Sequence, residues 1–172
     1  MSVSLVLTVI GDDRPGLVGE LSAAISARQG NWLDSSMSHL AGKFAGIVRV
    51  DVPAQNAAAL QADLKAMPHL KVTAETSAGE ACAPRARRLT LSLVGHDRIG
   101  IVREVSQVLA GHGVNVEELA THTSSAPMSA ETLFHAQAAL TAGEDLDGRA
   151  LKAALEAISN DLMVDVTLGE IV

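Results

Sequence analysis

Aromatic residues are nearly absent from this 172-residue chain and make up 2% of it. There is no tyrosine, and the aromatic side chains are Trp32, Phe44 and Phe134. Apolar residues nevertheless account for 48% of the sequence, which is enough to form a packed interior and argues against disorder. The sequence therefore predicts a folded protein whose core is built from aliphatic side chains.

Cysteine is also scarce, and Cys82 is the single one. An internal disulfide bond is therefore excluded. This fits a reducing compartment. Residues 1–10 lack a basic leader and a small-residue cleavage site, so we expect no secretory signal. No apolar run approaches the roughly 18 residues of a membrane span. The sequence thus predicts a cytoplasmic protein that makes no membrane contact.

Positive charge is limited, and the net charge of the chain is −7. The charge is −1 over residues 1–78, +2 over residues 79–88 and −8 over residues 89–172. An acidic surface with few aromatic side chains is poorly suited to phosphate backbones and stacked bases. The one basic cluster, Arg85, Arg87 and Arg88, is interpreted as a solvated linker in preference to a nucleic-acid patch. We expect no direct binding to nucleic acid.

Signatures of catalysis are missing as well. The six histidines show no HxxxH or HExxH spacing, and a lone cysteine cannot complete a zinc site of the usual spacing. There is no G-x-S-x-G elbow and no phosphate-loop lysine. The sequence therefore predicts a protein that is not an enzyme and holds neither a metal nor a cofactor.

The chain does contain an internal sequence repeat. Residues 11–20 are GDDRPGLVGE and residues 95–104 are GHDRIGIVRE, an offset of 84 residues. At this offset, ten of the 28 residues from Leu5 to Trp32 are identical to their counterparts from Leu89 to Val116. That spacing suits a small domain copied once. We therefore predict domains over residues 1–78 and 88–172, joined by a linker over residues 79–87.

Both copies predict the same order of elements. Apolar residues alternate with period two over residues 3–9 and 89–93, and then recur at helical spacing over residues 17–25 and 101–109. Gly30 and Gly113 are expected to end these helices. Two strands, a second helix and a last strand follow in each half. The pattern is β-α-β-β-α-β twice, which predicts an α+β fold of two ferredoxin-like sandwiches with the helices on one face of each antiparallel sheet.

Each predicted sheet keeps one uncovered face and unpaired edges. Such surfaces are commonly buried by a second sheet. We therefore expect the sheets to pair, either within the chain or between chains as a homo-oligomer, with a dimer as the simplest form.

The repeated segment lies between a strand and the first turn of a helix, where backbone N–H groups and the helix dipole attract anions. Gly16 and Gly100 would let a carboxylate approach that turn closely. Asp13 and Asp97 either cap the helix or bind the ammonium group of a ligand, and position alone favours capping.

Asn31 and Asn115 follow the helices, and we expect them close to the loops. Their amides can donate and accept hydrogen bonds to a ligand. The alternative is a turn residue that tolerates left-handed geometry.

The order of these features resembles the ACT domain. It consists of a strand, the letters D-R-P-G followed by a hydrophobic residue and valine, an amphipathic helix, and G-N before the next strand. The ACT domain is a regulatory module whose families often bind amino acids near that glycine loop. The tandem layout is similar to the glycine cleavage system transcriptional repressor family. The resemblance implies the following ligand-binding residues: Asp13, Arg14, Gly16, Leu17 and Asn31, and Asp97, Arg98, Gly100, Ile101 and Asn115.

Two classes of function remain open at this stage. The first is a regulator that senses a small ligand, such as the amino acid glycine, and acts by contact with a partner protein. The resemblance implies that this partner is a transcription activator of glycine cleavage genes. The second is an interaction module that binds no ligand, in which the repeated segment only builds a turn.

Overall fold

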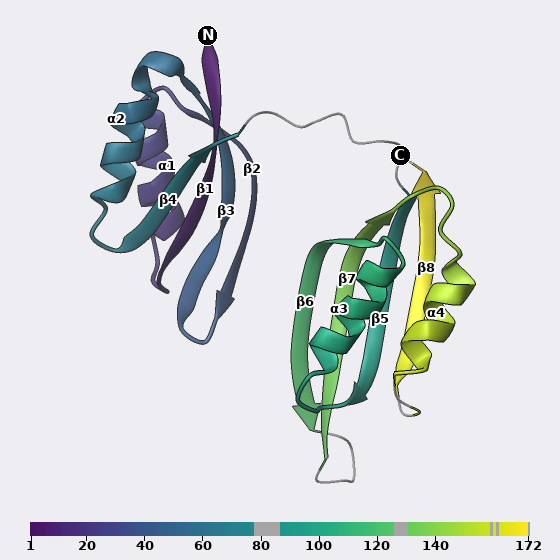
Figure 1. Ribbon diagram of the computed structural model, residues 1–172. Helices are drawn as coiled ribbons and strands as arrows, with labels where there is room; N and C mark the ends of the chain where they lie inside the picture. The colour runs from purple at the N-terminus through teal and green to yellow at the C-terminus, as the bar shows by residue number, and fades with distance from the viewer. Residues whose placement is uncertain (78–86, 126–130, 159, 161, 172) are drawn as a thin grey trace. The chain divides into compact units, whose positions relative to one another are not determined.

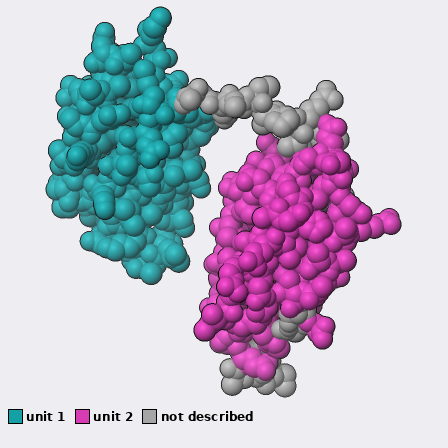
Figure 2. Space-filling model, viewed as in Figure 1, with its two compact units in different colours: residues 1–81 teal, residues 82–172 magenta. Residues whose placement is uncertain are grey.

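The computed structural model describes residues 1–77, 87–125, 131–158, 160 and 162–171. The chain forms two compact units, unit 1 over residues Met1–Ala81 and unit 2 over residues Cys82–Val172 (Figure 2). The predicted linker of residues 79–87 falls outside the described residues except for Arg87. Arg87 is the first residue of a strand. The predicted domain limits, residues 78 and 88, stay predictions.

Each unit contains the predicted β-α-β-β-α-β order (Figure 1). The elements of unit 1 are β1 (Ser2–Asp12), α1 (Leu17–Ala27), β2 (Asn31–Leu40), β3 (Lys43–Pro53), α2 (Ala54–Lys65) and β4 (Leu70–Thr76). Those of unit 2 are β5 (Arg87–His96), α3 (Ile101–Gly111), β6 (Asn115–Ser125), β7 (Thr132–Ala142), α4 (Gly148–Glu156) and β8 (Met163–Ile171). The predicted fold class is confirmed.

Both sheets have the same topology. The strand order is β2-β3-β1-β4 in unit 1 and β6-β7-β5-β8 in unit 2, and each neighbouring pair is antiparallel. The two helices of each unit lie on one face of its sheet (Figure 1). Since β1 and β2 both run antiparallel to β3, they are parallel to each other, and α1 carries the chain back from the end of β1 to the edge where β1 began.

Alternating strand residues face the helices and form an aliphatic core in each unit. In unit 1, Leu5, Leu7 and Val9 of β1 are at most 1% exposed, as predicted from their period-two spacing. In unit 2, Phe134 is the single aromatic side chain of the buried cluster among the described residues. Trp32 and Phe44 pack at the margin of the unit 1 core. The expectation of an aliphatic interior is confirmed.

The ends of the first helices differ from the prediction in unit 1. Gly113 ends α3 with φ of 67°, whereas in unit 1 the left-handed residue is Gln29, with φ of 60°, and not Gly30. Glycine is needed at position 30 for another reason. A Cβ there would lie 2.7 Å from Cγ2 of Ile25, so only glycine allows this close approach.

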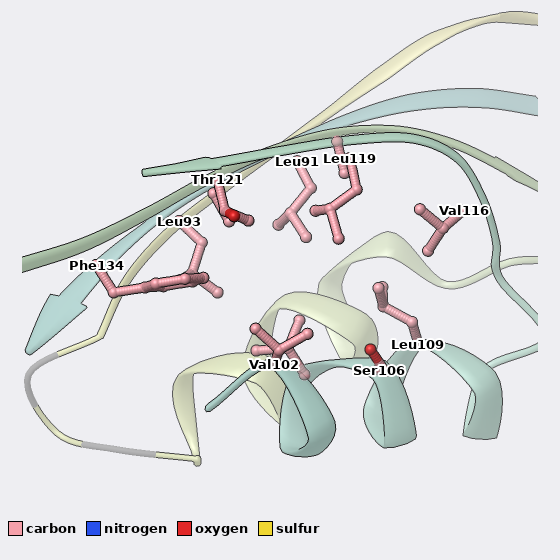
Figure 3. Close-up of a pocket in the computed structure, with 12 residues that line it drawn as sticks. Leu91, Leu93, Val102, Ser106, Leu109, Val116, Leu119, Thr121 and Phe134 are labelled. Atoms are coloured by element: carbon pink, nitrogen blue, oxygen red, sulfur yellow. The ribbon is translucent and has the colours of Figure 1, made fainter. Parts of the chain in front are cut away.

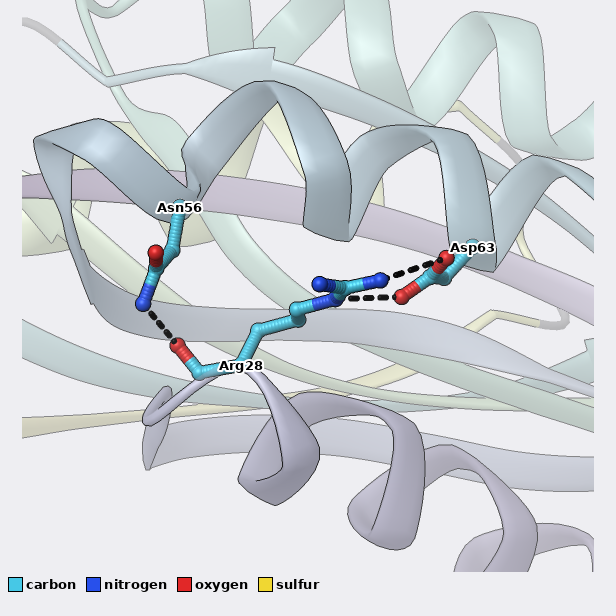
Figure 4. Close-up of polar contacts among 3 residues, drawn as sticks. All are labelled: Arg28, Asn56 and Asp63. Atoms are coloured by element: carbon cyan, nitrogen blue, oxygen red, sulfur yellow. Dashed lines mark hydrogen bonds and ion pairs between the residues drawn. The ribbon is translucent and has the colours of Figure 1, made fainter.

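A polar contact ties the two helices of unit 1 together (Figure 4). Arg28, just after α1, donates to both carboxylate oxygens of Asp63 on α2, at 2.6 and 3.2 Å. The side-chain amide of Asn56 donates to the Arg28 carbonyl at 2.9 Å. The residue of unit 2 that corresponds to Arg28 is His112, which follows α3. The residue that corresponds to Asp63 is Ala154, because each directly precedes a buried leucine of the second helix, Leu64 or Leu155. Unit 2 therefore has no counterpart of this contact at those positions.

Candidate functional site

The loop between β1 and α1 is a tight turn that requires glycine. Gly16 has φ of 95° and ψ of −6°, which are the angles of the third residue of a type II turn, and Pro15 precedes it as that turn favours. Gly100 has φ of 93° and ψ of −3°, and the Ile101 N–H lies 3.4 Å from the Arg98 carbonyl across the turn. Both loops thus have the same backbone, although Ile99 replaces proline in the second.

Gly16 and Gly100 themselves occupy the N-cap positions of α1 and α3. Across the described residues, no side chain caps the first turn of either helix. The interpretation of Asp13 and Asp97 as helix caps is therefore wrong, because the type II turn places each aspartate three residues before the cap. The N–H groups of these first turns point toward the loop, as expected of a helix start.

Asp13 is held against the β2–β3 hairpin. Its N–H donates to the Gly42 carbonyl at 3.0 Å, and its carboxylate lies 3.6 Å from Nε2 of His39. In unit 2 the Asp97 N–H donates to the Thr132 carbonyl at 2.8 Å. The backbone fixes both aspartates, while the half-exposed Asp13 side chain stays accessible to a cation from solvent.

Arg14 and Arg98 each form an ion pair with the glutamate six residues later. In unit 1, Nη2 of Arg14 donates to both carboxylate oxygens of Glu20 at 2.7 Å. In unit 2, Arg98 donates to Glu104 through two nitrogens at 3.0 and 2.6 Å. The hydrogen bonds from Arg98 lower the pKa of Glu104. These arginines fasten the loop to its helix, so their charge is already balanced.

The two predicted asparagines lie away from the loops. Asn31 pairs with Asp51, which pairs with Ser4 near the beginning of β1, whereas the loop follows Asp12. Ser4 and Asp12 are eight residues apart along β1, so Asn31 and the loop are separated by about 26 Å along the strand direction. Asn115 lies at the same level of unit 2, at the other end of the sheet from Gly100. The expectation that they lie close to the loops of their own units is wrong.

Four of the predicted residues of unit 1 do come together. Asp13, Arg14, Gly16 and Leu17 line one open hollow of about 240 Å³, together with Phe44 of β3. Leu17 itself is 3% exposed, so its side chain belongs to the core of unit 1. The arrangement offers helix N–H donors for an anion and one carboxylate for a cation.

Glu20, Glu104, His39 and Phe44 belong to these loops but are not among the predicted site residues. Glu20 and Glu104 could have been found, because they recur at the same offset as the arginines that they bind. His39 and Phe44 have no such signal, since hairpin contacts bring them to the loop.

Within the described ranges, no group of three or more His, Cys, Asp and Glu side chains is placed to hold a metal ion. No described helix is long and apolar enough to cross a membrane.

Comparison with known proteins gives a consistent result. The family model of the ACT domain matches residues 4–74. A crystal structure of a protein of unknown function from Galdieria sulphuraria is 31% identical, with a TM-score of 0.81 over 100% of this chain and 99% of that one. A structure provisionally named as a glycine cleavage system transcriptional repressor is 17% identical, with a TM-score of 0.73 over 99% of both chains. A search among curated proteins gives no significant match.

The matched residues cover almost all of unit 1, and unit 2 repeats its strand order, its type II turn and its arginine–glutamate pair. The chain therefore belongs to the ACT-domain family and carries two ACT folds in tandem.

Proposed function

We propose that this chain is a non-enzymatic regulator that binds a small amino acid, such as glycine, at its β–α loops and acts by contact with a protein partner. The observation that carries the proposal is the hollow of unit 1. It combines a helix start without a capping side chain, which suits a carboxylate, with the Asp13 carboxylate, which suits an ammonium group.

The partner assignment rests on the whole-chain likeness to the structure provisionally named as a glycine cleavage system transcriptional repressor. We propose an accessory repressor of glycine cleavage genes whose partner is a transcription activator. The net charge of −7 supports action through protein contact, since an acidic surface opposes binding to a phosphate backbone. The uncovered sheet faces and the edge strands β2 and β6 support a dimer.

One observation favours the alternative of an interaction module without a ligand. The type II turn and the Arg14–Glu20 pair account structurally for the repeated letters R-x-G and for the glutamate that follows. In that case no selection for ligand binding is needed to explain the repeat. The alternative predicts that the loops bind no amino acid.

Calorimetry of the full chain against glycine and the other small amino acids separates the two proposals. Asp13→Asn removes the charge that would meet the ammonium group, and we expect a loss of affinity of about tenfold or more. Asp12→Asn is the matched control, since Asp12 pairs with Lys43 at the end of the strand and does not line the hollow. A Gly16→Val variant is unsuitable because residue 16 has φ of 95°, and valine would strain the turn itself.

Absence of binding by the unmodified chain at millimolar amino acid would overturn the sensor and support the interaction module. An equal loss of affinity in Asp13→Asn and Asp12→Asn would remove Asp13 from the site.

A further inference from the structure

Unit 2 contains an apolar cavity between its first helix and its sheet. The cavity measures about 30 Å³ and lies between α3 and the helix-facing side of β5, β6 and β7 (Figure 3). The hydroxyls of Ser106 and Thr121 are the polar side-chain groups among the described residues that line it, and none of those residues is charged. The cavity therefore suits an aliphatic group and disfavours an ion.

Three positions that line the cavity have smaller side chains in unit 2 than in unit 1, whereas Leu119 is larger than its counterpart Ser35. Val48 pairs with Leu7 in unit 1, and its counterpart Ala138 pairs with Leu91 in unit 2. Thr121 likewise stands where unit 1 has Met37, which packs against the core of unit 1. A second large side chain of that core, Trp32, corresponds to Val116.

A glycine allows unit 1 to close this space. Gly46 of β3 lies opposite Met37, and a Cβ at residue 46 would come within 2.3 Å of the Ser36 carbonyl oxygen and 2.7 Å of the Met37 Cα. The residue opposite Thr121 in unit 2 is Ala136, which already carries a Cβ. In unit 2, the edge strand β6 therefore cannot approach β7 as closely as β2 approaches β3 in unit 1.

The cavity of unit 2 shares two lining positions with the hollow of unit 1. Val18 and Phe44 line the hollow of unit 1, and their counterparts Val102 and Phe134 line the cavity of unit 2. Val102 is the second residue of α3, directly after the turn, and it is 44% exposed. Leu119 of β6, also in the lining, is 54% exposed. Two apolar residues of the lining are therefore open to solvent.

We propose that this cavity receives the side chain of an aliphatic amino acid held at the loop of unit 2, so that the two units select different ligands. The inference rests on the proposed function, and it adds the class of ligand at the second site. Unit 1, in which Trp32 and Met37 pack into the corresponding space, takes an amino acid without a side chain. Ala138 and Thr121 determine the specificity of unit 2.

The volume sets the size of the side chain. One water-sized sphere needs about 10–15 Å³, so 30 Å³ accepts two or three carbon atoms. That matches the isopropyl group of valine. A cavity that holds an aromatic ring is about 150 Å³, so phenylalanine is excluded.

The test is a titration of the full chain with glycine, L-valine and L-phenylalanine, followed by NMR of labelled methyl groups. The methyls of Val102, Val116 and Leu119 report on unit 2, and the indole N–H of Trp32 reports on unit 1. We expect valine to bind unit 2 at least about tenfold more tightly than glycine and to move these methyl signals, because each buried methylene typically contributes that factor. We expect no preference for valine at unit 1.

Two variants fill the cavity by different routes. Ala138→Val introduces the residue type found at the counterpart Val48, and Ser106→Leu fills the space from α3. Each is expected to abolish the preference for valine over glycine at unit 2. Ala139→Val is the matched control, the same change at the next residue of β7, which faces away from the cavity. It should keep the preference.

Glycine binding with no preference for valine at unit 2 would overturn the inference and leave the proposed function standing. A preference that persists in both filled variants would also overturn it, because the side chain would then lie elsewhere. Failure of every amino acid to bind either unit would overturn the inference together with the proposed function.

Discussion

Units 1 and 2 share one backbone design but are packed differently. Unit 1 brings its edge strand close over the core through Gly46 and Met37 and joins its helices through Arg28 and Asp63. Unit 2 has Ala136 and Thr121 at the first pair of positions and keeps a cavity of about 30 Å³. Duplication thus preserved the turn and its arginine–glutamate pair, while the side chains behind the turn diverged. The side chains behind a repeated loop can therefore differ while the fold stays the same.

The largest effect is expected from breaking the close approach in unit 1. Gly46→Ala places a Cβ against backbone atoms of β2 and should lower the free energy of unfolding of unit 1 by about 3 kcal/mol. Urea unfolding followed by the fluorescence of Trp32, the single tryptophan, measures unit 1 selectively. The reciprocal Ala136→Gly should cost unit 2 about 1 kcal/mol or less, because it removes a methyl group without relieving a clash. An unchanged urea midpoint in Gly46→Ala would mean that β2 moves outward freely, and the contrast between the units would disappear.

A smaller effect is expected where the two first helices end. Gln29 has φ of 60° and Gly113 has φ of 67°, so unit 1 holds a side chain in a conformation that glycine adopts readily. Gln29→Gly should raise the free energy of unfolding of unit 1 by about 0.5–1 kcal/mol, since relief of the left-handed strain exceeds the entropy cost of glycine. Thermal melting detected at Trp32 reports the change. Gly113→Gln should lower the stability of unit 2 by a similar amount. A loss of stability in Gln29→Gly would contradict the proposed strain.

The smallest effect concerns the helix contact found in unit 1. The hydrogen bonds from Arg28 lower the pKa of Asp63 below its ordinary value of 3.8. A lowered carboxyl pKa stabilises the fold above the unfolded pKa, and this contribution disappears as the pH falls through the folded pKa. Asp63→Asn should therefore lower the melting temperature of unit 1 slightly at pH 7, and the difference from the unmodified chain should shrink below about pH 4. The half-exposed position of both side chains keeps the effect small. A difference that stays constant from pH 7 to pH 2 would show that the Asp63 charge is not involved.

The sequence was sufficient for most of the fold because the fold depends on local periodicity. Alternation placed Leu5, Leu7 and Val9 in the core, and the helical spacing after Gly16 placed α1 correctly. The repeat also identified the two glycines whose turns need positive φ. The candidate site was predicted less completely. Asp13, Arg14, Gly16 and Leu17 are neighbours in the chain and line one hollow, whereas His39 and Phe44 reach it through the hairpin.

By itself the sequence determined that this protein is an aliphatic α+β chain, duplicated once, with a glycine turn at the start of each first helix. The elements follow from residue type and from spacing within about ten residues, and the duplication follows from the identities at an offset of 84 residues. The tertiary structure alone decided that Asn31 begins its strand at the end of the sheet opposite the loop, because a crossover helix returns the chain to the edge where it started. It also decided that unit 2 contains a cavity and that Trp32 and Met37 pack against the core of unit 1, because packing depends on the summed volumes of side chains that are distant in sequence.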